Sequence, residues 1–418
     1  MTRIRAHLRV LRSLAVAACA VLLWAAAVVA PVEGRQQPPA PPQQMPTFRS
    51  TSNLVQVDVI VRDQRDNFVA GLTPDDVEVY ENGVRQRIEQ FYLVRRDVTV
   101  KSDAPSAESP RRVFVLLFDE SDLETSALQR IKKGAEQFLL SQFDPGDLGG
   151  VVVRGEFYKG KLTTDRTLLL AGIEALKPAF DSRESRLRPF REFPRIPGEA
   201  EAARLVNGDA FLLQQLGQQA CQDDPRACAQ DGGLQRVENH LQQKARLYIG
   251  QARESTRNTL DALQMVTNAL AKLPGRKTVV LFSDGFFIEE SRNLVQHLSG
   301  LAARGGVTIY GVDGRGLVGG RKPMPDVLDA GRPLDGTLDT GGDGPEMLAD
   351  GTGGFVVRRT DDVAKALNAV VRDTSTYYVV GYSPTNAVMD GTFRAISVKV
   401  KSSELSVRAR RGYIAVSK

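Results

Sequence analysis

The sequence has few residues of the kinds that bind zinc or form nucleophile–base pairs. Among 418 residues there are three cysteines and three histidines, too few for a zinc cluster built from those side chains. There is no G-x-x-x-x-G-K phosphate loop, no G-x-S-x-G nucleophile turn and no histidine directly beside a serine or cysteine. These absences exclude phosphate-loop NTPases and hydrolases of the corresponding types.

The chain also lacks a marked net charge once its first thirty residues are set aside. It has 55 basic and 50 acidic residues, a formal charge of +5. Four arginines and no acid stand in the first thirty residues, so the remainder is close to neutral. The excess positive charge typical of a nucleic-acid-binding protein is therefore missing, and we expect no nucleic-acid partner.

The first thirty residues have the pattern of an export signal. Residues 1–12 are basic, residues 13–30 are almost wholly apolar, and small residues near Ala30 offer cleavage sites. We expect an exported protein of the periplasm, the cell envelope or the medium, attached to a membrane only if this segment is retained. The Pro/Gln-rich residues 31–47 predict an extended linker.

Alternating apolar residues at both ends of the mature chain predict antiparallel strands. Residues 55–61 place valine at every second position, and residues 396–400 and 405–409 alternate in the same way. Either end alone would leave exposed strand edges, which promote aggregation. We therefore expect residues 48–97 and 375–418 to form one discontinuous β-sandwich domain. A polar linker is expected at 98–110.

Continuous apolar runs separated by amphipathic helices fill the centre of the sequence, residues 111–374. The runs at 113–118 and 278–282 are typical of strands buried on both faces. This alternation predicts a doubly wound α/β domain with a mostly parallel sheet. The glutamine-rich residues 181–250 predict an inserted lid or subdomain, and the Gly/Asp/Pro-rich residues 313–344 predict a flexible loop.

Acidic side chains follow two of the buried runs. Asp119, Glu120 and Ser121 come after the first run, and Asp284 comes after the second. In open parallel sheets, ligands bind beyond the carboxyl ends of the strands. Carboxylate and hydroxyl oxygens suit Mg²⁺, Mn²⁺ or Ca²⁺, so a divalent-ion site is expected here. The alternative is that Asp119 and Asp284 only cap helices and close turns.

This arrangement resembles the metal-ion-dependent adhesion site of von Willebrand factor type A domains. The first strand of that family ends in D-x-S-x-S, a second loop supplies a threonine, and a later strand end supplies an aspartate. By position, the resemblance implies these metal ligands: Asp119, Ser121, Thr163 or Thr164, and Asp284. The chain resembles more widely the exported bacterial members of that family, through its GLTPDDVEVYENG and YYVVGYSP stretches.

The resemblance implies a non-catalytic protein-binding or adhesion module. An acidic side chain of a protein partner would complete the coordination of the ion. Leu123 stands at the third motif position and cannot coordinate, so a weak site is expected, which a serine at that position would strengthen. Two alternatives stay open: a metal-free scaffold of the cell envelope, and a metal-dependent hydrolase with Glu120 as the base.

Two cysteines lie close together in the predicted insert. Cys221 and Cys228 enclose six residues. In an oxidising compartment, cysteines at this spacing usually pair. We therefore expect a disulfide that closes a short loop.

Overall fold

The structure is a computed structural model that describes residues 54–95, 112–178, 182–286, 291–314, 340–358 and 360–416. All of these residues belong to one unit, Ser52–Lys418. The predicted export signal, both predicted linkers and most of the predicted loop at 313–344 lie outside the described residues. None of the helices within the described residues is long and apolar enough to cross a bilayer.

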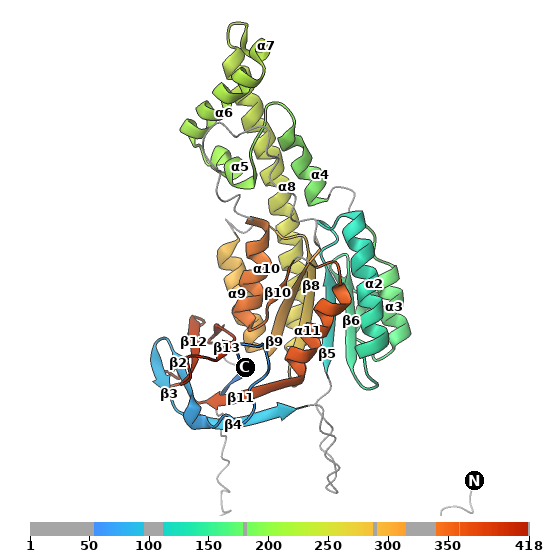
Figure 1. Cartoon of the computed structure of the whole chain (residues 1–418), viewed down its shortest axis with the longest axis vertical. Helices are drawn as coiled ribbons and strands as arrows, with labels where there is room; N and C mark the ends of the chain where they lie inside the picture. The colour runs from blue at the N-terminus through green and yellow to red at the C-terminus, as the bar shows by residue number, and fades with distance from the viewer. Residues whose placement is uncertain are drawn as a thin grey trace, which may run out of the picture. The chain divides into compact units, whose positions relative to one another are not determined.

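Strands from both ends of the described chain form two four-stranded antiparallel sheets (Figure 1). The first has the order β13 (Ser406–Ala409), β1 (Val55–Arg62), β11 (Thr376–Tyr382), β4 (Ile88–Arg95). The second has the order β14 (Gly412–Ile414), β12 (Phe393–Val400), β2 (Val77–Glu81), β3 (Val84–Gln86). Valines of β1 and β2 pack with tyrosines of β11 and β14 in one apolar core, so the two sheets form a small sandwich.

Each sheet joins strands that are distant in the sequence. Val57 of β1 pairs with Val380 of β11, and Val79 of β2 pairs with Val398 of β12. The predicted pairing of the two terminal segments is therefore confirmed. Between β2 and β3, Asn82 and Gly83 both have positive φ, as a two-residue hairpin turn requires.

The centre of the chain forms a six-stranded sheet. Its order is β10 (Val356–Val357), β9 (Val307–Asp313), β8 (Lys277–Ser283), β5 (Val113–Phe118), β6 (Leu148–Val153), β7 (Glu156–Phe157). All neighbours are parallel except β6 and β7, which form an antiparallel hairpin. Every residue of β5 and β8 is buried, in agreement with their continuous apolar sequences.

Helices cover both faces of this sheet (Figure 1). One face packs against α2 (Thr125–Gln142), α3 (Arg166–Glu174) and α11 (Val363–Ser375). The other packs against the second half of α8 (Gly233–Leu270), together with α9 (Arg292–Arg304) and α10 (Thr340–Thr352). The mixed α/β architecture with a mostly parallel sheet agrees with the prediction. Residues 340–344 were predicted as the end of the loop, but they form the first residues of α10.

The predicted insert is helical, but its upper boundary at residue 250 lies inside a single helix. Its short helices α4 (Arg183–Leu187), α5 (Glu199–Val206), α6 (Ala210–Asp223) and α7 (Pro225–Cys228) precede α8. They pack on the first half of α8, around Leu241 and Ile249 (Figure 1). The second half of the same helix packs on the sheet. The chain therefore changes from insert to sheet layer without leaving α8.

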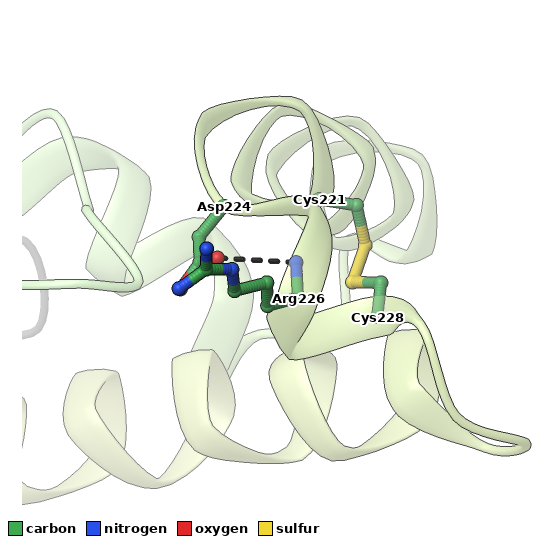
Figure 2. The surroundings of a disulfide bond; sticks show 4 residues. All are labelled: Cys221, Asp224, Arg226 and Cys228. Atoms are coloured by element: carbon green, nitrogen blue, oxygen red, sulfur yellow. Dashed lines mark hydrogen bonds between the residues drawn. A yellow bond between two sulfur atoms is a disulfide. The ribbon is translucent and has the colours of Figure 1, made fainter.

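The predicted disulfide is present between α6 and α7 (Figure 2). Cys221 and Cys228 are bonded, with their Cα atoms 5.5 Å apart. The intervening turn is fixed by Asp224, whose Oδ1 accepts a hydrogen bond of 3.1 Å from the backbone N–H of Arg226. This is the N-cap of α7, and it brings the second cysteine back toward the first.

Candidate functional site

The strand order changes direction between β5 and β8. The chain continues from β5 to β6 on one side, whereas β8 lies on the other side of β5. Asp119 follows β5 and Asp284 follows β8. The backbone N–H of Asp119 donates to the carbonyl of Phe282 over 2.9 Å, so the two strand ends stay in register to this point. Asp119 and Asp284 therefore lie at the switch point of the sheet.

Asp119 is a buried carboxyl group surrounded by hydroxyls. Its Oδ1 accepts hydrogen bonds from Ser121 Oγ (3.2 Å) and Thr259 Oγ1 (3.0 Å), and its Oδ2 accepts one from Ser283 Oγ (2.8 Å). Burial, and secondly the nearby charge of Asp122, raise the pKa of Asp119 to about 8, against the lowering effect of the three hydroxyls. Asp119 therefore holds a proton more tightly than an exposed aspartate.

Thr259 is a member of this site that our sequence analysis did not identify. It lies on α8, 140 residues after Asp119 in the sequence. Four residues later on the same helix stands Leu263, which is wholly buried against the sheet. A hydroxyl residue on the apolar stripe of a helix is therefore the sequence signal that could have indicated Thr259.

Thr163 and Thr164 do not reach this site. Thr163 forms backbone hydrogen bonds with Gly149 at the start of β6. Gly149 pairs with Phe114, which lies five positions before Asp119. At roughly 3.3 Å per residue this is about 16 Å from the strand end that carries Asp119. The β6–β7 hairpin returns the chain to the start of β6 before the threonines occur. They therefore lie near the amino end of β6, not at the carboxyl end of β5 where Asp119 lies.

Leu123 fills the place of the third motif position with an apolar side chain. It is fully buried and belongs to the core beneath α2. A Cβ atom built on Gly314 would lie 2.5 Å from Asp284 Oδ1 and 2.6 Å from Leu123 Cδ2. These two atoms are therefore about 5 Å apart at most, so the apolar side chain of Leu123 lies in the neighbourhood of the Asp284 carboxylate. Asp284 Oδ2 also accepts a hydrogen bond of 3.4 Å from the backbone of Glu124.

A basic residue of the insert stands against this strand end. Arg186 of α4 forms an ion pair with Asp122, and the exposed fractions of the two side chains are 6% and 2%. Its Nη1 also lies 3.4 Å from the carbonyl oxygen of Ser121. On the preceding turn, Arg183 Nη1 donates to the carbonyl of Asp284 over 3.3 Å. Helix α4 therefore brings two guanidinium groups to the turns that carry Asp119 and Asp284.

These residues do not fit a resident divalent ion. Both oxygens of Asp119 already accept hydrogen bonds from hydroxyls, Asp122 is paired with a guanidinium, and Leu123 supplies no oxygen at the third motif position. Within the part of the chain that the structure describes, no three His, Cys, Asp or Glu side chains gather as a metal-binding group. Mg²⁺ prefers six oxygens in near-octahedral geometry, which this arrangement does not offer while Arg186 is paired with Asp122.

An open cleft of about 660 Å³ lies over the strand end. Asp119, Ser121 and Thr259 line it on the inside, and Arg154, Lys177 and Glu156 line its exposed rim. Glu120 also lines the cleft, but its two carboxylate oxygens accept hydrogen bonds from the backbone N–H groups of Arg154 (2.7 Å) and Lys177 (3.1 Å). Glu120 therefore fixes the two rim loops in place.

Comparison with known proteins gives no family for this chain. No protein-family model matches the sequence, and no curated protein matches it.

Several solved structures match this chain at low similarity. An aerotolerance-related membrane protein of Bacteroides fragilis is 11% identical, with 63% of this chain and 97% of that chain covered, at a TM-score of 0.32. The conserved hypothetical protein BatB of Bacteroides thetaiotaomicron is 14% identical, with 63% and 98% covered, at 0.31. Three N-terminal domains of the type V pili tip protein Mfa5 of Porphyromonas gingivalis are 10% identical, with 88% and 69% covered, at 0.32. Scores of this size do not establish a common fold.

Proposed function

We propose that this chain is an exported, non-catalytic binding module of the cell envelope that recognises a protein partner at the cleft over Asp119. The observation that carries the proposal is the position of this cleft, beyond the carboxyl ends of β5 and β8 at the switch point. Sheets of this class bind their ligands there. The signal-like residues 1–30 and the Cys221–Cys228 disulfide support export.

The use made of Glu120 favours binding over hydrolysis. A metal-dependent hydrolase would need this carboxylate as a base that is free to take a proton from water. Both of its oxygens instead hold backbone N–H groups of the rim, at 2.7 and 3.1 Å. Moving Glu120 toward a substrate would release both rim loops. These two hydrogen bonds support the binding proposal over the hydrolase alternative.

The rim suggests which part of a partner enters the cleft. Arg154 and Lys177 are both exposed and are joined through their backbones to the same Glu120 carboxylate. Their positive side chains can pair with single acidic groups of a partner, next to the exposed acids Glu156 and Asp261 that also line the cleft. Each exposed ion pair contributes up to about 1 kcal/mol, or about fivefold in affinity. The partner's acid would thus pair with rim cations in place of a bound metal.

Photo-crosslinking tests this proposal in cells that export the protein. A photoreactive amino acid at Glu156, on the cleft rim, should give a discrete protein adduct. The same group at Asn368, an exposed position of α11, should give none. Reversing the rim charge with Arg154→Glu and Lys177→Glu should reduce the adduct at Glu156 by about tenfold. Equal adducts from both positions, or none from Glu156, would contradict binding at this cleft.

A further inference from the structure

The short helix α4 belongs to the insert but lies against the strand-end site. Arg186 pairs with Asp122, and the backbone N–H of Arg183 lies 3.4 Å from the Asp122 carbonyl oxygen. Asp122 is therefore contacted both through its side chain and through its backbone. Its backbone N–H in turn bonds to the carbonyl of Asp119 over 3.2 Å. Helix α4 is therefore connected to Asp119 through the single turn that contains Asp122.

The buried acids of this turn require positive charge or protons. Asp119, Asp122 and Asp284 are each no more than 5% exposed. An ionised carboxylate at such depth is unfavourable unless it is paired. Arg186 supplies this charge for Asp122, because its own side chain is equally buried and arginine stays protonated in proteins.

We propose that Arg186 is the resident cation of the turn that carries Asp119, and that its pairing with Asp122 supplies there the positive charge which a divalent ion supplies in adhesion sites of the resembling family. The wild-type site is then closed to divalent ions as long as α4 stays docked. This inference deepens the proposed function, because it concerns the same site and makes its occupancy depend on the insert.

Arg183 links this cation to the core of the insert. Its guanidinium pairs with Glu199 of α5 at 2.7 Å, and Glu199 also accepts a hydrogen bond from the hydroxyl of Tyr248 on α8. Both partners lie in or beside the apolar core that holds α5 to α8. Displacing α4 would therefore break contacts in the insert as well as the pair with Asp122.

Replacing Arg186 by glutamine tests the proposal. Arg186→Gln removes the charge and leaves Asp122 buried without its cation. We expect Mn²⁺ to bind this variant at least about tenfold more tightly than the wild type, which corresponds to about 1.4 kcal/mol. Electron paramagnetic resonance of free Mn²⁺ measures the affinity, and the melting temperature with and without millimolar Mn²⁺ reports the accompanying gain in stability.

Two further variants serve as controls. Arg188→Gln removes an exposed arginine two residues away and should leave Mn²⁺ binding at the wild-type level. Asp122→Asn combined with Arg186→Gln removes both charges, so it should fold without Mn²⁺ and show no melting shift when Mn²⁺ is added. If Arg186→Gln folds poorly, the folded yield after refolding should be higher in Mn²⁺ than in a chelator.

The proposal is overturned if Mn²⁺ binds the wild type as tightly as Arg186→Gln, or if Mn²⁺ improves neither binding nor refolding of that variant. This outcome is separate from the crosslinking result at Glu156. A partner adduct at the cleft with no Mn²⁺ response in Arg186→Gln would keep the binding function and reject the role of Arg186. A Mn²⁺ response without an adduct would do the reverse.

Discussion

The carboxylate of Glu81 on β2 joins the N-terminal and C-terminal parts of the β-sandwich, so the stability of the sandwich should be sensitive to its mutation. It is 3% exposed and comes from the N-terminal half. Its Oε2 accepts hydrogen bonds from the hydroxyls of Tyr382 (2.8 Å) and Tyr413 (3.1 Å), and its Oε1 pairs with Arg394 at 3.5 Å. All three partners come from the C-terminal half. We predict that Glu81→Ala strongly destabilises the fold.

The expected loss follows from what the substitution leaves behind. Arg394 is 1% exposed, and without Glu81 its buried charge would keep only the partly exposed Asp390 at 3.6 Å and the carbonyls of Asn386 and Val388. Removing one partner of a buried ion pair costs about 3 to 5 kcal/mol. The two tyrosine hydroxyls also lose their acceptor, which adds to the cost although the terms are not additive. We therefore expect a loss of about 4 kcal/mol or more in the free energy of unfolding.

Glu78 offers a matched control on the same strand. Its salt bridge with Arg85 spans 3.0 Å and it accepts a hydrogen bond of 2.8 Å from the Tyr80 hydroxyl, but the side chains of Glu78 and Arg85 are 27% and 63% exposed. Removing an exposed pair of this kind costs about 1 kcal/mol or less. Urea unfolding gives both free energies, and hydrogen exchange shows which strands lose protection. In Glu81→Ala, β2 and β12 should lose protection together.

A loss for Glu81→Ala as small as that for Glu78→Ala would refute the reasoning. It would mean that Asp390 and the two backbone carbonyls are enough to stabilise the buried charge of Arg394. Loss of protection in β2 without any change in β12 would also count against it, because the terminal segments would then be held together by other contacts.

Three further predictions concern the site and the insert. The folded protein raises the pKa of Asp119 from 3.8 to about 8. The unfolding free energy of the wild type should therefore fall between pH 5 and 8 relative to that of Asp119→Asn, by up to about 1.4 kcal/mol per pH unit. Parallel curves of unfolding free energy against pH for the two proteins, measured in a chelating buffer, would contradict this. Leu123→Ser should cost about 3 kcal/mol through the cavity it leaves and bring no gain in Mn²⁺ affinity while Arg186 is present, which calorimetry checks. The double variant Cys221→Ser/Cys228→Ser should lower the stability of α6 and α7 by about 2.5 kcal/mol, measured by hydrogen exchange. Unchanged protection of these helices would show that the disulfide does not stabilise the loop.

The strands of the central sheet could be predicted because their sequences carry the information locally. The runs at 113–118 and 278–282 are apolar at every position, and the structure makes both of them fully buried strands. The position of Asp119 and Asp284 followed directly, since a residue after a parallel strand must lie at the carboxyl edge of the sheet. The sequence signal for these acids is short-range, and it does not depend on the rest of the fold.

The remaining members of the site come from contacts distant in the sequence. Thr259 lies on a helix that must pack in a particular rotation before its hydroxyl faces Asp119. Arg186 lies in a five-residue helix whose charged sequence shows no apolar period. The prediction that Thr163 or Thr164 joins the site failed for the same kind of reason. The β6–β7 hairpin returns the chain to Gly149, at the start of β6, before these threonines occur. Motif order in the sequence does not determine which end of a sheet a loop reaches.

The insert both leaves and rejoins the α/β layers at the candidate site. On the way in, the backbone N–H of Lys177 bonds to Glu120, next to Asp119. On the way out, Thr259 of α8 bonds to Asp119 itself. A force or a ligand that moves the insert would therefore act on residues that line the cleft, in addition to the contacts of α4 with Asp122 and Asp284. Because α8 continues unbroken from the insert into the sheet layer, such a movement would tilt or shift Thr259 along with it. Binding at the cleft and movement of the insert should consequently be linked. The factor by which an insert movement changes the affinity of the cleft equals the factor by which a ligand in the cleft changes the equilibrium constant of that movement.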